Sequence, residues 1–291
     1  MSEKVKIILD KNADILRLPA IALRGLVVFP GNVIHFEVGR PKSIAAIEWA
    51  MNNNNAVFLT AQQDMDVEDP GFKDLYPYGV VAEIKQVLRV SDDLVKVLVE
   101  GKYRAKLLTL DSSGRFLLAS TKASAMRGGK SSDPARIEAL LRSIKTAFEE
   151  YIGLNTRMPK DVVYTIITSD SAAFLCDYIP GNLLLKYTDK QLLLNEGTLL
   201  GRLEKILEVL RRETKILRIE KDIQTKVNEQ MDKNQRDYYL REQMRVISDE
   251  LDDSEDTRKE AEEYRARIDA LQLPEEASEK LRKEADRLYK M

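Results

Sequence analysis

Residues 80–99, VVAEIKQVLRVSDDLVKVLV, decide the fold of the first part of the chain. Val80–Val90 is a long apolar-rich run, and Leu94–Val99 alternates apolar residues with Lys96. Between the two runs lies Ser91-Asp92-Asp93, a cluster of residues that favour turns. Alternation with a period of two is typical of a half-buried strand. The stretch therefore predicts two β-strands separated by a turn.

Further short strands are expected on both sides of this pair, at residues 33–38, 103–110 and 116–121. Turn residues separate them, at Pro30-Gly31, Gly101 and 112–114. A helix is expected after Arg40-Pro41, because Ile44, Ile47 and Met51 recur at helical spacing before a run of asparagines. Residues 1–123 therefore predict a curled β domain with one covering helix.

The apolar period becomes helical after residue 123. Asp133 is suited to cap a helix whose first residue is Pro134. Shorter helices are expected around 160–168 and 170–179, with breaks at Pro159 and Pro180-Gly181, and Thr188 and Gln191 have capping-box spacing for another. Residues 124–198 therefore predict a helical subdomain, with a linker at about 124–132.

The last third of the chain contains no residue that would end a helix for more than fifty positions. No glycine follows Gly201, the only proline is Pro274, and 27 of residues 241–291 are charged. At about 1.5 Å per residue, a helix over residues 199–251 would be about 75 Å long, so it must project or pair. We expect this long helical arm to be interrupted at Ser254–Thr257. A helical segment over residues 252–291 would follow, with Pro274 opening its last helix.

Apolar residues along the arm form two stripes on different faces. The first contains Ile223, Val227, Met231 and Tyr238, and the second contains Leu240, Met244, Ile247 and Leu251. The second stripe begins two residues away from the position at which the first stripe would continue. This change of face suggests that the arm changes partner or bends near residues 238–240. Met and Tyr side chains make adaptable apolar contacts. The candidates for binding a polypeptide or another arm are therefore Met231, Tyr238, Tyr239 and Met244, although helix–helix packing alone would also explain each of them.

Composition excludes several classes of function. There are 46 basic and 48 acidic residues, so no basic excess exists to attract nucleic acid. The single cysteine and single histidine argue against disulfides, zinc sites based on histidine and a Cys–His dyad. No apolar run reaches the roughly 18 residues of a membrane span, and the N-terminus does not resemble a signal peptide. We expect a cytoplasmic protein without a membrane partner.

The motifs that suggest catalysis have simpler interpretations. Gly128-Gly129-Lys130-Ser131 resembles the end of a phosphate-binding loop, but Ser124 stands where that loop needs glycine. His35 is interpreted as a hydrogen-bonded structural residue and Cys176 as a small buried apolar one. The acidic run at 249–256 lacks the spacing of a calcium loop. We therefore expect no catalytic, cofactor-binding or metal-binding residue in this chain.

Five blocks of sequence resemble one family. They are LPAIALRGLVVFPG (18–31), VGRPKSIAAIEWAM (38–51), VEDPGFKDLYPYGVVAEIKQ (67–86), VKVLVEGKYRAKL (95–107) and VNEQMDKNQRDYYLREQMRVISDEL (227–251). In composition and order they are similar to the N-terminal region of bacterial Lon proteases. The resemblance covers essentially the whole chain and stops about where the AAA+ ATPase module of the family would begin.

The resemblance implies a PUA-like β domain, a helical subdomain and a coiled-coil-like arm. It also implies capture of unfolded, damaged or degron-bearing proteins for a homohexameric, ATP-dependent enzyme. ATP and Mg would bind the absent ATPase module, and a Ser–Lys dyad in an absent protease domain would cut the substrate. No position here matches those motifs, so we expect no catalytic activity from this chain alone.

Two other functions remain open. The chain can be an oligomerisation scaffold whose arms pair without capturing substrate. It can also be an RNA-binding module, since fold does not fix function, although the acidic balance argues against RNA. An independent enzyme is the class that the sequence favours least.

Overall fold

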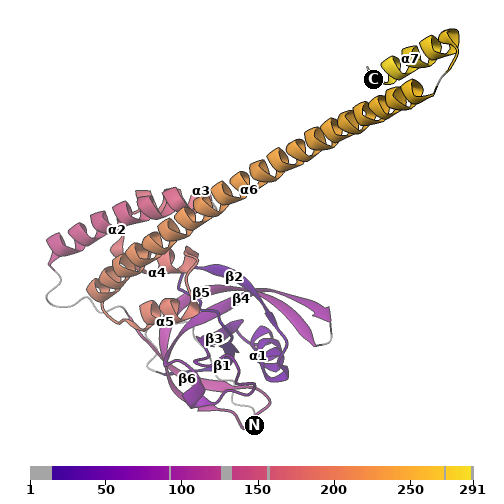
Figure 1. The fold of residues 1–291 in the computed structure, drawn as a ribbon. Coiled ribbons are helices and arrows are strands. Elements are labelled where there is room, and N and C mark those ends of the chain that lie inside the picture. The colour runs from indigo at the N-terminus through magenta and orange to yellow at the C-terminus, as the bar shows by residue number, and fades with distance from the viewer. Residues whose placement is uncertain (1–14, 92, 126–132, 156–157, 272, 290–291) are drawn as a thin grey trace. The chain divides into compact units, whose positions relative to one another are not determined.

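A computed structural model describes residues 15–91, 93–125, 133–155, 158–271 and 273–289 (Figure 1). The chain divides into two compact units, Met1–Arg218 and Ile219–Met291. The first unit contains a β-sheet and several helices, and the second contains the greater part of one long helix and a final short one. The predicted glycine-containing linker lies largely outside the described residues.

The sheet of the first unit curls until two of its strands meet. Its strand order is β2-β5-β4-β3-β1-β6, and β5 also pairs with β6. All pairs are antiparallel except the parallel pair of β1 and β3. The strands are β1 (Leu16–Leu23), β2 (Val33–Val38), β3 (Ala56–Ala61), β4 (Tyr78–Ser91), β5 (Leu94–Asp111) and β6 (Leu118–Ala123). The predicted α+β class, with a β-rich first part, is confirmed.

Strand β5 is one 18-residue strand, so the predicted turn at Gly101 is wrong. The glycine instead permits a close backbone contact. A Cβ atom at Gly101 would lie 2.2 Å from the carbonyl oxygen of Phe29. The Gly101 N–H donates to Asn32 O at 2.9 Å, and its carbonyl accepts from Gly31 N at 2.8 Å. Gly101 therefore holds the β1–β2 loop against β5.

Helix α1 (Pro41–Met51) covers part of the sheet, next to β1 and β3, as expected (Figure 1). Pro41 stands at its first turn, where the missing N–H costs nothing. Ile44 and Ile47 are buried against the sheet, whereas Met51 is exposed at the end of the helix.

The helical part of the first unit contains α2 (Pro134–Leu154), α3 (Lys160–Thr168), α4 (Ala172–Asn182) and α5 (Tyr187–Asn195). Asp133 caps α2 as predicted, because its carboxylate accepts from Ala135 N at 3.0 Å. The break expected at Pro180 does not occur there, since α4 includes that residue. The capping box at Thr188 is also wrong: α5 begins one residue earlier, and Gln191 donates to Tyr78 O at 2.8 Å instead.

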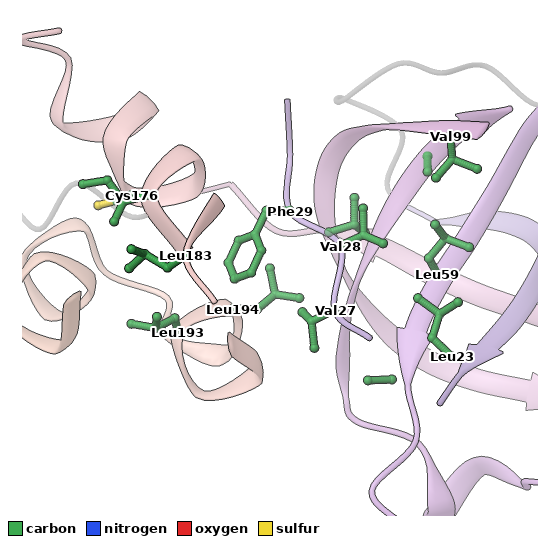
Figure 2. Packing of buried hydrophobic residues seen from close by; sticks show 14 of the residues in the cluster. Leu23, Val27, Val28, Phe29, Leu59, Val99, Cys176, Leu183, Leu193 and Leu194 are labelled. Carbon is green, nitrogen blue, oxygen red and sulfur yellow. The ribbon is translucent and has the colours of Figure 1, made fainter. Parts of the chain in front are cut away.

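Sheet and helices share one apolar core. Figure 2 shows Val28 and Phe29, from the β1–β2 loop, lying between sheet residues such as Leu59 and the helical residues Leu183 and Leu194. All five side chains are at most 3 % exposed. The boundary that the sequence suggested at residue 123 therefore runs through a continuous core, and the β domain and helical subdomain form one unit.

Helix α6 (Leu199–Ala270) begins in the first unit and supplies most of the second. It runs for 72 residues without interruption, so the predicted break at Ser254–Thr257 and the predicted arm end at residue 251 are wrong. Ser, Asp and Thr cost only fractions of a kcal/mol each inside a helix. Without glycine or proline, that cost is too small to end the helix.

The second unit ends in a helical hairpin. Helix α7 (Glu275–Tyr289) begins directly after Pro274, as predicted. It packs against the end of α6, where Ala261, Ile268 and Ala285 are buried. Ion pairs join Arg265 with Asp286, and Arg282 with Asp269 at 2.5 Å. Within the part of the chain that the structure describes, no helix is long and apolar enough to cross a membrane.

Candidate functional site: an apolar cavity at strand β2 and an exposed helix face

A cavity of about 330 Å³ opens in the first unit where β1, β2 and the start of α1 meet. Ile21, Leu23 and Val38 are buried and form its apolar floor, and Leu26 and Phe36 are half-buried at its sides. The exposed side chains of Arg24 and Glu37 also line it, together with Ala22, Gly39, Arg40 and Ser43. An apolar floor with charged groups at the rim suits a single apolar side chain of a ligand.

A partly buried hydrogen-bond network holds the rim of this cavity. Arg40 donates from Nη2 to Gln62 Oε1 at 2.5 Å and from Nη1 to Ala22 O at 3.3 Å. Gln62 is fully buried and donates in turn to Val67 O at 2.9 Å. Burial lowers the pKa of the Arg40 guanidinium, and the neighbouring Arg24 cation lowers this pKa further. Arginine remains protonated at neutral pH, so Arg40 supplies a positive charge at the rim, beside the carboxylate of Glu37.

Strand β2 forms an edge of the sheet beside the cavity. Among the strands that the structure describes, β2 pairs with β5 alone, and it contributes Phe36, Glu37 and Val38 to the cavity. An edge strand presents backbone donors and acceptors to which an extended polypeptide can pair. The site therefore combines an apolar cavity with a neighbouring strand edge.

The four side chains expected to bind a polypeptide or another arm lie on α6, in the second unit. Met231 is 64 % exposed, Tyr238 70 %, Tyr239 62 % and Met244 72 %. The Tyr239 hydroxyl accepts a hydrogen bond from Gln243 Nε2 at 3.0 Å, one turn further along the helix. These side chains are available for contact, and their role stays a prediction.

Cys176 and His35, the residues weighed for catalysis whose side chains the structure describes, do not assemble an active site; Gly128–Ser131 and most side chains of the acidic run at 249–256 lie outside the described part. Cys176 is buried, as predicted, and desolvation raises the pKa of its thiol to about 12, so it is no nucleophile at neutral pH. His35 lies exposed on β2 and makes no hydrogen bond with its side chain among the described residues, so the predicted structural bond is wrong. Over the described ranges, no group of three or more metal-ligating residues gathers.

A family model described as the ATP-dependent protease La (LON) substrate-binding domain matches residues 17–212. The chain belongs to this family. The Lon protease of Heliobacterium modesticaldum is 38 % identical over 291 residues, which are 100 % of this chain and 35 % of that protein. The Lon protease of Escherichia coli K12 is 37 % identical over 281 residues, covering 97 % of this chain and 36 % of its own length. The chain thus spans about a third of these Lon proteases.

A solved structure of a Lon N-terminal domain shares the fold. The N-terminal domain of the Mycobacterium avium complex Lon protease superposes with a TM-score of 0.54 at 20 % identity, covering 67 % of this chain and 98 % of that one. The segment matched to the Lon substrate-binding family contains the whole cavity beside β2 and ends before Met231.

Sequence reasoning missed the cavity. Its residues come from three segments that are separated by a loop and a turn, and Arg40-Pro41 was interpreted only as the start of a helix. The signal that could have found it is the alternation in VIHFEV, which places Phe36 on the same face as Ile34.

Proposed function

We propose that this chain is the substrate-recognition and assembly region of an ATP-dependent Lon protease, and that it binds unfolded, damaged or degron-bearing proteins. The observation that carries the proposal is the match of residues 17–212 to a substrate-binding family. Unfolding would be driven by an ATPase module that uses ATP and Mg, and cleavage would be performed by a Ser–Lys protease domain. The chain itself would contribute no bond-breaking step.

The cavity beside β2 is the surface that we assign to the substrate. Unfolded proteins expose large apolar side chains on extended backbone, and folded ones bury them. A cavity of about 330 Å³ is at the small end of ligand pockets, so it accepts one such side chain. The edge of β2 that no described strand covers can pair with the adjoining backbone, which requires no particular sequence. Affinity for one segment would be low, and several copies in a hexamer would raise the effective concentration of a held chain.

NMR titration tests this assignment. The probe is a small protein that is reduced and alkylated, compared with its native, disulfide-bonded form. We expect the unfolded form alone to shift backbone resonances of Leu26, Phe36 and neighbouring residues. Phe36→Ala should weaken binding about tenfold, because the contact loses between one and two kcal/mol of apolar burial. Phe72→Ala is the matched control, because Phe72 is an exposed phenylalanine that does not line the cavity. Equal shifts with both forms of the probe would contradict the proposal.

The alternative is an oligomerisation scaffold that captures no substrate. It is favoured by the exposed apolar side chains of α6, which include Val227 at 47 % and Met244 at 72 %. Light scattering of the whole chain, of Val227→Glu and of Met244→Glu measures whether these faces join copies. Self-association that these variants abolish, in a chain that binds no unfolded protein, would establish the scaffold and remove substrate capture.

A further inference from the structure

A second cavity, of about 290 Å³, lies where the sheet meets the helical part of the first unit. Arg104 of β5, Asp177 of α4 and Arg202 of α6 line it together with Ser124, which follows β6. The other lining residues are Pro30, Lys102, Tyr103, Ala123 and Ala125. Nothing in the proposed binding of polypeptide at β2 uses this cavity.

Two buried arginines dominate its chemistry. Arg104 is 4 % exposed and Arg202 is 2 % exposed. Both donate to the same carbonyl oxygen, that of Glu196: Arg104 from Nη1, and Arg202 from Nε at 2.8 Å. Two cations that converge on one neutral acceptor repel each other. The proximity of Arg202, after burial itself, lowers the pKa of Arg104.

Within the described part of the chain, only one of the two arginines has a carboxylate partner. Arg202 donates from Nη1 to Asp177 Oδ1 at 2.6 Å. Lys102 is already paired with Glu83 at 2.8 Å and Glu100 at 2.7 Å. Lys85 pairs with the same two carboxylates, so these four groups balance in charge. Among the described residues that line the cavity, the charges then sum to one excess positive charge, and Arg104 is the cation that no ion pair holds.

The contacts of Arg104 leave one side of its guanidinium almost unused. Its carbon lies 4.4 Å above the centroid of the Tyr78 ring, and Nη2 is 3.3 Å from the Ser124 hydroxyl. Nε is buried and has no hydrogen-bond partner among the described residues. Nε and Nη2 form the side of a guanidinium that a carboxylate binds through two parallel hydrogen bonds.

We propose that this cavity binds a carboxylate group, held by Arg104 with Arg202 behind it. A buried cation without a counter-charge is costly, and a singly charged ligand removes that cost. A purely structural clamp on the Glu196 carbonyl explains Arg104 Nη1 and Arg202 Nε. Such a clamp does not explain why Arg104 Nε has no hydrogen-bond partner among the described residues, or why the cavity has an excess positive charge. The group can belong to a free small carboxylate or to a polypeptide, and the experiment separates these sources.

The test is a titration of the whole ¹⁵N-labelled chain with sodium acetate, read at the Nε–H resonances of arginine and compared with sodium chloride at equal ionic strength. Acetate should shift the Arg104 Nε–H signal saturably, and chloride should not. Disappearance of the signal in Arg104→Lys assigns it. The peptides acetyl-Gly-Gly-Glu-amide and acetyl-Gly-Gly-Gln-amide form a matched pair, and a shift with the first alone shows that a polypeptide can supply the carboxylate. Phosphate binding tighter than acetate would overturn the choice of a singly charged ligand.

Variants separate ligand binding from a structural role. Ser124→Asp places a carboxylate beside Nη2, so it should abolish the acetate shift and raise the thermal midpoint. Arg115→Lys is the control, because Arg115 is an exposed arginine paired with Glu48, and it should leave the shift unchanged. The absence of any saturable shift in the unmodified chain, or a lower midpoint in a folded Ser124→Asp variant, would overturn the proposal. Substrate capture at β2 would still stand, since its titration reads different residues.

Discussion

Phe29→Ala tests whether the sheet and the helices of the first unit fold as one. Phe29 is 1 % exposed and lies between the sheet and the helices in the shared core (Figure 2). It comes from the β1–β2 loop, which Gly101 holds in place through the hydrogen bond between Gly101 N and Asn32 O. Truncation would leave a cavity at the junction itself.

The expected loss is about 3–5 kcal/mol, the range for replacing a buried phenylalanine with alanine. A domain is stable by about 5–15 kcal/mol, so the variant should fold but lose a large share of its stability. For a unit of this size, each kcal/mol lowers the thermal midpoint by about 2–4 °C. The midpoint should therefore fall by roughly 6–20 °C.

Two probes follow the two parts separately during urea denaturation. Trp49 is the only tryptophan, and it lies on α1 with its ring 5.6 Å from that of Phe116, so its fluorescence reports on the sheet. Hydrogen exchange of peptides from α2 to α5 reports on the helices. The two transitions should coincide in the unmodified chain and separate in Phe29→Ala, because the junction has lost a large, fully buried side chain.

Phe58→Ala is the matched control. Phe58 is also fully buried, but it belongs to a second apolar cluster whose buried members all come from the β part of the unit. The control should lose a similar amount of stability while its two transitions still coincide. A loss below about 1 kcal/mol in Phe29→Ala, far under the usual range, would refute the reasoning. Equal separation of the transitions in both variants would also refute it.

Three further predictions concern buried and exposed groups. Burial raises the pKa of the Cys176 thiol from 9.0 to about 12 in the folded chain. The thiol therefore contributes its full stabilisation below pH 9, and this contribution falls between pH 9 and 12 by about 1.4 kcal/mol per pH unit. Urea midpoints measured across this range should lack this slope in Cys176→Ala. Arg202→Leu should cost up to about 3–5 kcal/mol, because it leaves the half-buried carboxylate of Asp177 without its partner. Combining Arg202→Leu with Asp177→Leu should cost less than the sum of the two single losses, and additive losses in denaturation would contradict the pairing. Met231→Ala and Tyr238→Ala should change the free energy of unfolding by less than about 0.5 kcal/mol, because both residues are exposed. Both variants should weaken self-association or substrate binding. Unchanged light scattering and unchanged titration with unfolded protein would count against their role.

The elements that the sequence predicted well are those with a visible period. Residues 33–38 alternate, and the structure makes them strand β2 with the same bounds. Strands β1 and β3 were not among the predicted strands. Seven of eight residues of β1 and all six of β3 are buried, so their apolar residues do not alternate with polar ones. Gly101 was misinterpreted because its role depends on Phe29, which is 72 positions away in the chain.

The same limit applies to the sites. A cavity such as the one beside β2 is formed by residues that meet only after folding, and no local pattern shows that Arg40 reaches Gln62. The sequence predicted a long helical arm because no glycine follows Gly201 and no proline lies between Gly201 and Pro274. Its end was misplaced because the Ser254–Thr257 segment weakens a helix without stopping it.

The exposed apolar side chains of α6 in the second unit lie on two different faces of the helix. An ideal helix advances about 100° per residue, so Ile223, Val227, Met231 and Tyr238 fall within an arc of about 80°. The second set, Leu240, Met244 and Ile247, is centred about 140° away from the first. One packed neighbour covers a stripe about 100° wide, so no single straight partner can bury both sets. All seven side chains are 46–72 % exposed.

We infer that the two faces meet different partners. The regular spacing of the first face suits packing against another helix, and the flexible Met244 side chain on the second face suits contact with polypeptides of varied sequence. The Val227→Glu and Met244→Glu variants proposed above therefore need not give the same result, and a loss of self-association in the first alone would assign the two faces.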